Sequence, residues 1–242
     1  NRCLVGSEMC IRDSHLRLRI WINMQEIFEF NNIIAVLLAY LIGSIPSAIW
    51  VSKWFFGVDV RDYGSNNAGA TNTFRVIGKL AGFSVLFVDI LKGWASVKLI
   101  TTYFFTATLS QEAFINMQLA VGISAVLGHV FPVYEQFQGG KGVATLMGII
   151  LAINFQAAIG CVIIFLLIFL VTNFVSLGAI TAAFFFPIFT IFVLKSNSPS
   201  LIYFSISISI LVIITHKKNI ERLLTGTESK MSIKLKKAKN VE

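Results

Sequence analysis

Residues 143–172 read VATLMGIILAINFQAAIGCVIIFLLIFLVT, thirty positions without one charged side chain. A single helix of this length would measure about 45 Å at 1.5 Å per residue, well beyond the ~30 Å hydrocarbon core of a bilayer. Asn154 and Gln156 interrupt the apolar run near its middle. The stretch therefore predicts two short membrane helices, 143–156 and 157–172, joined as a hairpin.

The whole chain has the composition of a protein dissolved in lipid. Of its 242 residues, 56% are hydrophobic and 13% are charged, against roughly 25% charged in soluble domains; the mean hydropathy is +0.78. This excludes an ordinary soluble domain and a disordered chain, and three scattered cysteines do not form a disulfide framework. We read the net charge of +8 as a membrane charge bias, with no nucleic-acid binding.

Breaks in the apolar pattern predict an all-α integral membrane protein with seven transmembrane helices. Besides the hairpin, the predicted helices are 33–56, 81–105, 114–132, 177–195 and 200–215. Pro46 should kink the first helix, with Ser44 and Ser47 satisfying the backbone groups that it frees. Asp89 and Lys92, three residues apart in the second helix, should pair and face the bundle interior, because unpaired charge is costly in lipid.

The distribution of basic residues predicts the orientation. Arg61, Arg75 and Lys79 follow the first helix, and eight lysines and arginines follow the last, whereas the loop near 106–113 carries only Glu112. Short loops rich in Lys and Arg stay in the cytoplasm. We therefore expect the N-terminus outside, the C-terminus inside, and one cytoplasmic group of segments: 57–80, 128–142, 173–176 and the tail.

The two ends of the chain differ from the membrane region. Residues 1–23 have mixed polarity and no signal-peptide core. We interpret them as a non-native leader or scar before Met24; an amphipathic leader lying on the membrane is the alternative. The predicted division is thus a leader at 1–23, a membrane domain at 24–228 and a basic cytoplasmic tail at 229–242.

The segment 61–75, RDYGSNNAGATNTFR, is the first candidate anion site. Gly64 and Gly69 permit conformations that turn several N–H groups toward one anion, and Arg75 can bind phosphate or carboxylate in a bidentate manner. From composition alone, a polar turn explains the segment equally well.

The segment 128–145, GHVFPVYEQFQGGKGVAT, is the second candidate. Gly139, Gly140 and Gly142 surround Lys141, just before a helix whose N-terminal dipole favours an anion. It is no nucleoside-triphosphate loop, because Glu135 replaces the first glycine of that pattern and Gly142 stands where Ser or Thr binds magnesium. A simpler phosphate fits this loop.

The segment 216–228, HKKNIERLLTGTE, supplies further polar groups. His216 and Asn219 are three residues apart and share one helical face. For His216 alone an interfacial position is the simpler explanation. We find no cluster of His, Cys and carboxylates at metal-ligand spacing and no G-x-S-x-G elbow, so we predict neither a metal nor a cofactor.

In this order, GSNNAGATN, FQGGKGVAT, SLGAI and HKKNIERLLTGTE resemble the motifs of the bacterial PlsY family of acyl-phosphate:glycerol-3-phosphate acyltransferases, over about 38–228. The resemblance implies a monomeric seven-helix enzyme of the bacterial inner membrane with a cytoplasmic active site. It implies transfer of a fatty acyl group from acyl phosphate to the 1-hydroxyl of glycerol 3-phosphate, which gives lysophosphatidic acid. Membrane lipid is the other expected partner.

The resemblance also assigns residues. It implies catalytic roles for Ser65, Arg75, Lys141, His216 and Asn219 and a structural role for Glu228. It implies substrate binding by Gly64, Asn67, Gly69, Thr71, Asn72, Gly139, Gly140, Gly142 and Ser176. Two positions depart from the family pattern: Asn66 replaces a glycine, which asparagine tolerates because it enters left-handed backbone easily, and Gln138 replaces a lysine.

Two mechanisms and two other functions stay open from the sequence. Proton transfer to the donor's own phosphate is our first hypothesis, and His216 as general base is the second. A transporter for a phosphorylated solute would share the glycine-rich anion loops but predicts repeats and polar groups through the bilayer, which we do not find. A non-catalytic lipid-binding scaffold is the other alternative.

Overall fold

The computed structural model describes residues 30–104 and 110–231, and within these ranges every regular element is helical. The helices are α2 (Phe30–Gly43), α3 (Ser47–Phe56), α4 (Ala70–Val76), α5 (Lys79–Phe104), α6 (Gln111–Val130), α7 (Val143–Ile153), α8 (Phe155–Thr172), α9 (Val175–Ile188), α10 (Pro199–Thr215) and α11 (Lys217–Leu224). Short turns η1 (Val60–Asp62) and η2 (Val133–Glu135) lie in loops, and the π-helical turn η3 (Phe189–Val193) continues α9. The predicted leader lies outside the described residues, as does the tail beyond 231.

The predicted membrane helices are all present within a few residues of their expected bounds. In the described ranges, five are long and apolar enough to cross a bilayer, and α10 with α11, bent by 62°, makes a sixth if counted together. The predicted helix 143–156 is shorter than expected: α7 has 11 residues and is about 16 Å long, less than a bilayer core. Crossing by all seven stays a prediction.

The hairpin at 143–172 is confirmed. Asn154 ends α7 and starts α8, where its side-chain oxygen accepts a hydrogen bond from the N–H of Ala157 at 2.9 Å. Asparagine is a preferred helix N-cap because it satisfies a backbone donor that has no partner within the helix. The polar residue inside the apolar run thus marks the turn.

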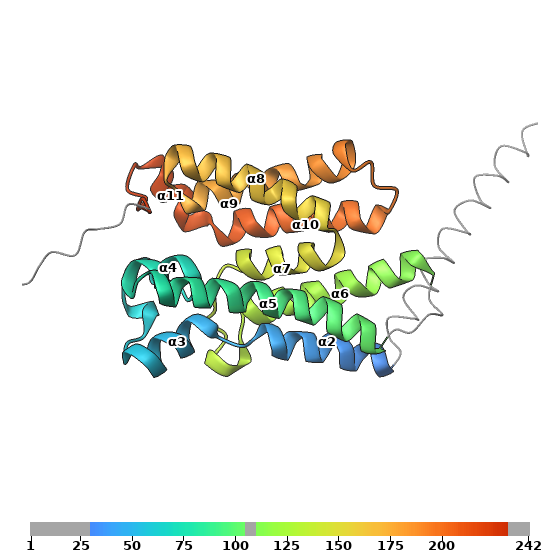
Figure 1. The fold of residues 1–242 in the computed structure, drawn as a ribbon, viewed down its shortest axis with the longest axis horizontal. Helices are drawn as coiled ribbons and strands as arrows, with labels where there is room; N and C mark the ends of the chain where they lie inside the picture. The colour runs from blue at the N-terminus through green and yellow to red at the C-terminus, as the bar shows by residue number, and fades with distance from the viewer. Residues whose placement is uncertain (1–29, 105–109, 232–242) are drawn as a thin grey trace, which may run out of the picture.

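The helices form two layers with α7 between them (Figure 1). One layer holds α2, α3, α5 and α6, and the other holds α8, α9 and α10; α7 packs against both α5 and α8. Small side chains such as Ala35, Ala39 and Ala125 are fully buried where α2 meets α6. Small residues allow helices to approach closely, and this is how helices associate in lipid.

A buried ion pair holds the break between α2 and α3. Asp89 and Lys92 on α5 lie 2.9 Å apart and are 1% and 4% exposed, which confirms the predicted interior pair. The expectation for the serines was wrong. Lys92 Nζ donates to the Ile45 carbonyl at 2.8 Å, Ser47 Oγ donates to Asp89 Oδ1 at 2.6 Å, and the buried Ser44 Oγ has no partner among the described residues. At the break, the Ile45 carbonyl accepts from the Ser47 backbone N–H at 3.0 Å and from the charged Lys92 donor, a charge-assisted bond that also stabilises the ammonium.

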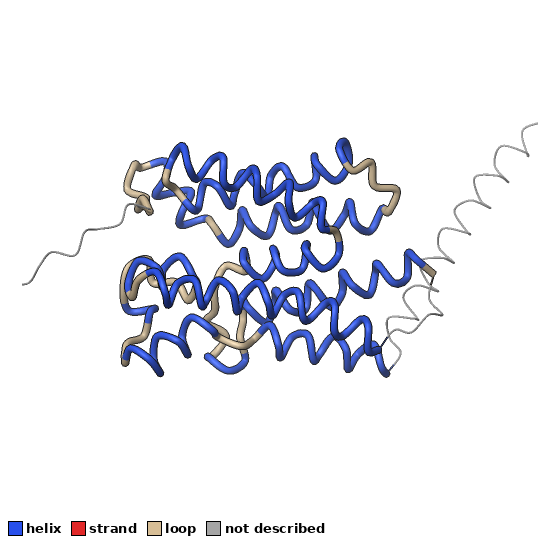
Figure 2. The backbone as a smooth tube through the Cα atoms, viewed as in Figure 1, coloured by secondary structure: helices blue, strands red, loops and turns tan. Residues whose placement is uncertain are grey.

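The polar loops gather at one end of the bundle. Figure 2 shows the loop segments between the helices, and those next to α3, α4 and α11 lie together. Residues from 64–75, 141–144, 175–176 and 216–229 line one cavity there. This confirms that the four segments predicted to share one face do so.

Candidate active site

The loop end of the bundle contains a cavity of about 390 Å³. All five predicted catalytic residues line it: Ser65, Arg75, Lys141, His216 and Asn219. So do most of the predicted substrate-binding residues, namely Gly64, Asn67, Gly69, Thr71, Asn72, Gly142 and Ser176. The deeper wall is apolar and comes from α5, α7 and α8, with Leu86, Ile90, Met147, Val162, Phe165 and Leu166. The cavity therefore joins a polar end to an apolar end.

Asn72 shapes the first loop. Its side-chain oxygen accepts from the Ser65 N–H at 2.9 Å, and its side-chain nitrogen donates to the carbonyls of Val60 and Tyr63 at 2.7 and 3.0 Å. Gly64 has a φ of +64°, and a methyl group there would overlap the Asn72 side chain. Asn72 thus lines the cavity, but its amide is occupied inside the loop, in contrast to the substrate-binding role predicted for it.

Asn66 occupies the left-handed region with a φ of +54°. Its side-chain nitrogen donates to the Arg61 carbonyl at 2.8 Å. Asparagine adopts this conformation more easily than other residues with a side chain. Asn66 thus adopts the left-handed backbone expected of it, and its side chain adds a hydrogen bond; that the departure from the family glycine is mild stays a prediction.

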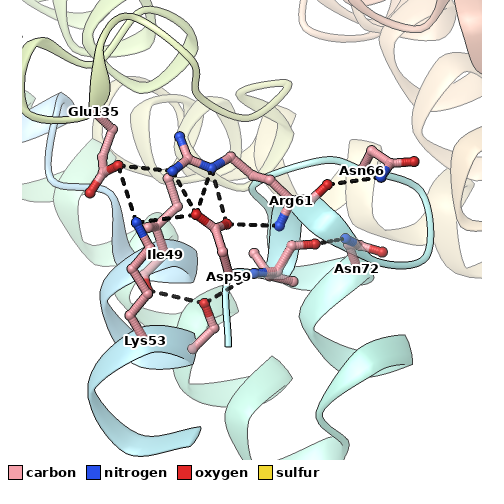
Figure 3. A network of polar contacts seen from close by, with 9 residues as sticks. Ile49, Lys53, Asp59, Arg61, Asn66, Asn72 and Glu135 are labelled. Atoms are coloured by element: carbon pink, nitrogen blue, oxygen red, sulfur yellow. Dashed lines mark hydrogen bonds and ion pairs between the residues drawn. The ribbon is translucent and has the colours of Figure 1, made fainter. Parts of the chain in front are cut away.

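A network of charged side chains fastens the first loop to the second (Figure 3). Arg61 Nη2 lies 2.7 Å from Asp59 Oδ2 and 3.0 Å from Glu135 Oε2, and Lys53 Nζ lies 3.1 Å from Asp59. The hydrogen bond from Arg61 is the main reason why the pKa of Asp59 is far below its usual value. Because Glu135 belongs to the loop that precedes Lys141, this network sets how the two loops lie relative to each other.

The second loop presents fewer free N–H groups than predicted. The N–H groups of Gly139 and Gly140 donate to the carbonyls of Val130 and His129 at 3.1 and 3.2 Å, and neither glycine is among the residues that line the cavity. Their predicted substrate-binding role is therefore not supported by their position. Lys141, Gly142, Val143 and Ala144 do line it. The first turn of α7 has N–H groups without acceptors inside the helix, which suits an anion.

Polar side chains from three segments meet around Lys141. Lys141 Nζ donates to Asn219 Oδ1. Asn219 Nδ2 and Ser176 Oγ both donate to Glu228 Oε1 at 2.8 Å, and Arg222 Nε donates to Glu228 Oε2 at 2.7 Å. Glu228 thus ties α9 and α11 together, as its predicted structural role requires.

The charges around the polar end favour an anion. Burial, followed by the positive charge of Arg222, lowers the pKa of Lys141 to about 8, and Arg75 acts in the same direction. Burial opposes ionisation of Glu228, yet the hydrogen bonds from Arg222, Asn219 and Ser176 lower its pKa overall. Three cations therefore face one carboxylate here, and a bound phosphate would relieve their mutual repulsion.

His216 has one defined ring nitrogen. Its side chain is 3% exposed, and Nδ1 lies 2.8 Å from the Val212 carbonyl. A carbonyl can only accept, so Nδ1 carries the hydrogen and Nε2 is the nitrogen of a neutral ring that can accept a proton.

Three titratable residues that line the cavity were not predicted as site residues: Asp89, His129 and Arg222. Arg222 is one of the eight basic residues after the last helix that we used only for orientation, although its spacing of three from Asn219 puts both on one face of α11. Asp89 was placed in the bundle interior without a link to the site. His129 carried no signal beyond its place before the glycine-rich segment.

Comparison with known proteins agrees with this geometry. Residues 33–226 match the family described as glycerol-3-phosphate acyltransferase. A glycerol-3-phosphate acyltransferase of Fusobacterium nucleatum is 43% identical over 195 residues, covering 81% of this chain and 95% of that protein. One of Enterococcus faecalis is 39% identical over 215 residues, covering 86% and 95%.

Solved structures agree as well. The crystal structure of PlsY, an integral membrane glycerol 3-phosphate acyltransferase, in its glycerol 3-phosphate form has a TM-score of 0.74 and 37% identity, over 83% of this chain and 95% of that one. Its lysophosphatidic acid form has a TM-score of 0.72. The chain therefore belongs to the PlsY family of glycerol-3-phosphate acyltransferases, which are integral membrane enzymes.

Proposed function

We propose that this acyltransferase takes its acyl group from acyl phosphate and forms lysophosphatidic acid at the 1-hydroxyl of glycerol 3-phosphate. The observation that carries the proposal is the lining of the cavity at the loop end of the bundle. Its polar end brings together Arg75, Lys141 and Arg222, and its apolar end lies between α5, α7 and α8. Two phosphates and one acyl chain need this combination of surfaces. The related PlsY structures with glycerol 3-phosphate and lysophosphatidic acid support the acceptor and the product.

The proposed reaction needs little acid–base help. The acceptor's hydroxyl oxygen attacks the acyl carbonyl carbon, the bond from that carbon to the phosphate oxygen breaks, and inorganic phosphate leaves with the hydroxyl proton. An acyl phosphate is a mixed anhydride with a good leaving group, so the protein mainly has to align two anions and stabilise developing charge. Arg75 and Lys141 neutralise the phosphates, while Ser65 and Asn219 orient them.

A base at His216 is the competing mechanism. Nδ1 is held by the Val212 carbonyl, so Nε2 is the atom that would take the hydroxyl proton. In His216→Gln, transfer to the donor phosphate predicts retained turnover with a flat profile between about pH 6 and 7, whereas a general base predicts a loss of more than about 100-fold.

We infer further that seven crossings place the loop end in the cytoplasm of a bacterial inner membrane. The excess of lysine and arginine in the loop segments supports this. So does the arrangement of the helices, because α2 begins at one end of the bundle and α11 lies at the other (Figure 1). On this proposal the enzyme is a monomer, residues 24–228 carry its activity and residues 229–242 are a cytoplasmic tail. A chain that begins at Met24 should keep full turnover, and a loss would refute the proposed division.

One assay tests the donor. Purified protein is incubated with labelled glycerol 3-phosphate and palmitoyl phosphate, palmitoyl coenzyme A or a palmitoyl carrier-protein thioester. The proposal predicts labelled lysophosphatidic acid and equimolar inorganic phosphate with palmitoyl phosphate alone. Lipid formed only from a thioester would refute the donor, and no lipid from any donor would favour a transporter or a scaffold.

A further inference from the structure

A buried polar cluster lies beneath the cavity. It consists of four buried residues: Ser47, Asp89, Lys92 and His129. Asp89 accepts from Ser47 at 2.6 Å and pairs with Lys92 at 2.9 Å, so the carboxylate is held from α3 and from its own helix. The mechanism proposed above uses none of these four side chains.

His129 faces this carboxylate from the end of α6. Its Nδ1 lies 3.7 Å from Asp89 Oδ1, and it has no hydrogen-bond partner among the described residues, although the side chain is only 7% exposed. Asp89 and His129 both line the cavity. Buried polar atoms without partners are rare and call for an explanation.

The other side of the His129 ring meets the two substrate loops. A methyl group added to Gly140 would overlap His129 Nε2 and would lie 2.7 Å from the Ala68 carbonyl. Ala68 sits between Asn67 and Gly69 in the first loop, whereas Gly140 precedes Lys141 in the second. His129 Nε2 and the Ala68 carbonyl therefore both lie on the side of Gly140 where a side chain would stand, and Asp89 lies near the other ring nitrogen.

We propose that His129, held toward Asp89, is a positioning residue that fixes the spacing between the loop of Ser65 and the loop of Lys141. The ring fills the space that a side chain at Gly140 would take, next to the Ala68 carbonyl, and so sets how closely the two loops approach. None of the phosphate contacts proposed above involves His129, so the ring governs alignment of the reacting atoms and leaves the affinity for glycerol 3-phosphate unchanged. Misplacement of reacting groups by about 1 Å costs on the order of 100-fold in rate. The proposal rests on the acyl transfer proposed above.

The test compares His129→Ala with His129→Gln in the full chain. Turnover of palmitoyl phosphate gives kcat and KM, thermal unfolding gives the midpoint, and a separate binding measurement gives Kd for glycerol 3-phosphate. For His129→Ala we expect kcat to fall about 10- to 100-fold, with KM and Kd for glycerol 3-phosphate within about threefold of wild type. His129→Gln keeps the volume and a polar atom near the Nε2 position, and should retain kcat within about fivefold.

A second arm uses the contact itself. Gly140→Ala should lower kcat strongly, and adding His129→Ala should restore part of that loss, because it removes the overlap of the methyl with Nε2 and leaves the 2.7 Å approach to the Ala68 carbonyl. The proposal is overturned if the two effects simply multiply, if His129→Ala leaves kcat unchanged, or if affinity falls as much as kcat. It is also overturned if both His129 variants unfold, since that marks a structural role. A wild-type protein inactive with palmitoyl phosphate would refute only the proposed donor, and the same comparison is then made with the donor that is used.

Discussion

Glu228→Gln tests how Glu228 holds the polar side chains around Lys141. Glu228 receives three hydrogen bonds: Asn219 and Ser176 donate to Oε1, and Arg222 donates to Oε2. Glutamine keeps the shape and one oxygen, so it can still accept from Asn219 and Ser176. It then turns an NH₂ group toward Arg222 Nε, a donor against a donor.

The structure sets the size of the effect. The Glu228 side chain is 6% exposed and that of Arg222 32%, so the lost bond is charge-assisted and partly shielded from water. Such a bond contributes about 1.5 to 3 kcal/mol, and the Arg222 exposure places the loss near the lower figure. At about 1.4 kcal/mol per factor of ten, kcat/KM for glycerol 3-phosphate should fall about 10- to 30-fold, because Arg222, which lines the cavity together with Lys141, loses the partner that holds it.

The assay is phosphate release at saturating palmitoyl phosphate with varied glycerol 3-phosphate. Glu221→Gln is the matched control: Glu221 lies on α11 beside Arg222, is exposed and stays outside the cavity lining. It should remain within about twofold of wild type, as surface changes usually do. A Glu228→Gln enzyme with wild-type kcat/KM, or equal losses in both variants, would refute the reasoning.

Three further predictions follow from the same geometry. The pKa of Lys141 is lowered to about 8, so the charged form that binds phosphate is lost as pH rises through 8. KM for glycerol 3-phosphate should therefore rise about tenfold from pH 7 to pH 9, whereas KM of Lys141→Arg should not change over this range. A wild-type KM that does not change with pH would contradict this. Asn72→Ala removes the acceptor of the Ser65 N–H and the donor to the carbonyls of Val60 and Tyr63, and it should reduce kcat at least about 100-fold in steady-state turnover. Near-normal turnover would show that the loop keeps its conformation without the Asn72 side chain. Asn66→Gly restores the usual family residue and loses one exposed hydrogen bond, so its kcat should stay within about twofold of wild type, and a large loss would show that the side chain itself acts in the site.

The sequence was sufficient for the features that hydropathy and charge control. The hairpin at Asn154 followed from a run too long for one crossing, and the Asp89–Lys92 pair followed from the cost of charge in lipid. The positive-inside rule predicted that the loop segments lie on one side of the membrane, and residues from these segments line one cavity; that this side is cytoplasmic stays a prediction.

The remaining features depend on where individual N–H, amide and ammonium groups point, which composition does not encode. Gly139 and Gly140 have the residue type of a phosphate loop, but their N–H groups point back to α6. Asn72 is polar and close to the site, yet three partners inside its own loop use its amide. Lys92, rather than a serine hydroxyl, reaches the Ile45 carbonyl because α5 packs next to the break. Each of these depends on which element lies opposite, and only the folded chain specifies that.

The account depends on separate loops meeting around bound phosphate. The most direct measurement is an experimental structure of this enzyme with glycerol 3-phosphate. We predict the phosphate of the ligand within about 3 Å of Lys141 Nζ and Asn219, at hydrogen-bonding distance, with its 1-hydroxyl directed toward Ser65. A ligand bound outside the cavity, or touching neither Lys141 nor Asn219, would contradict the account.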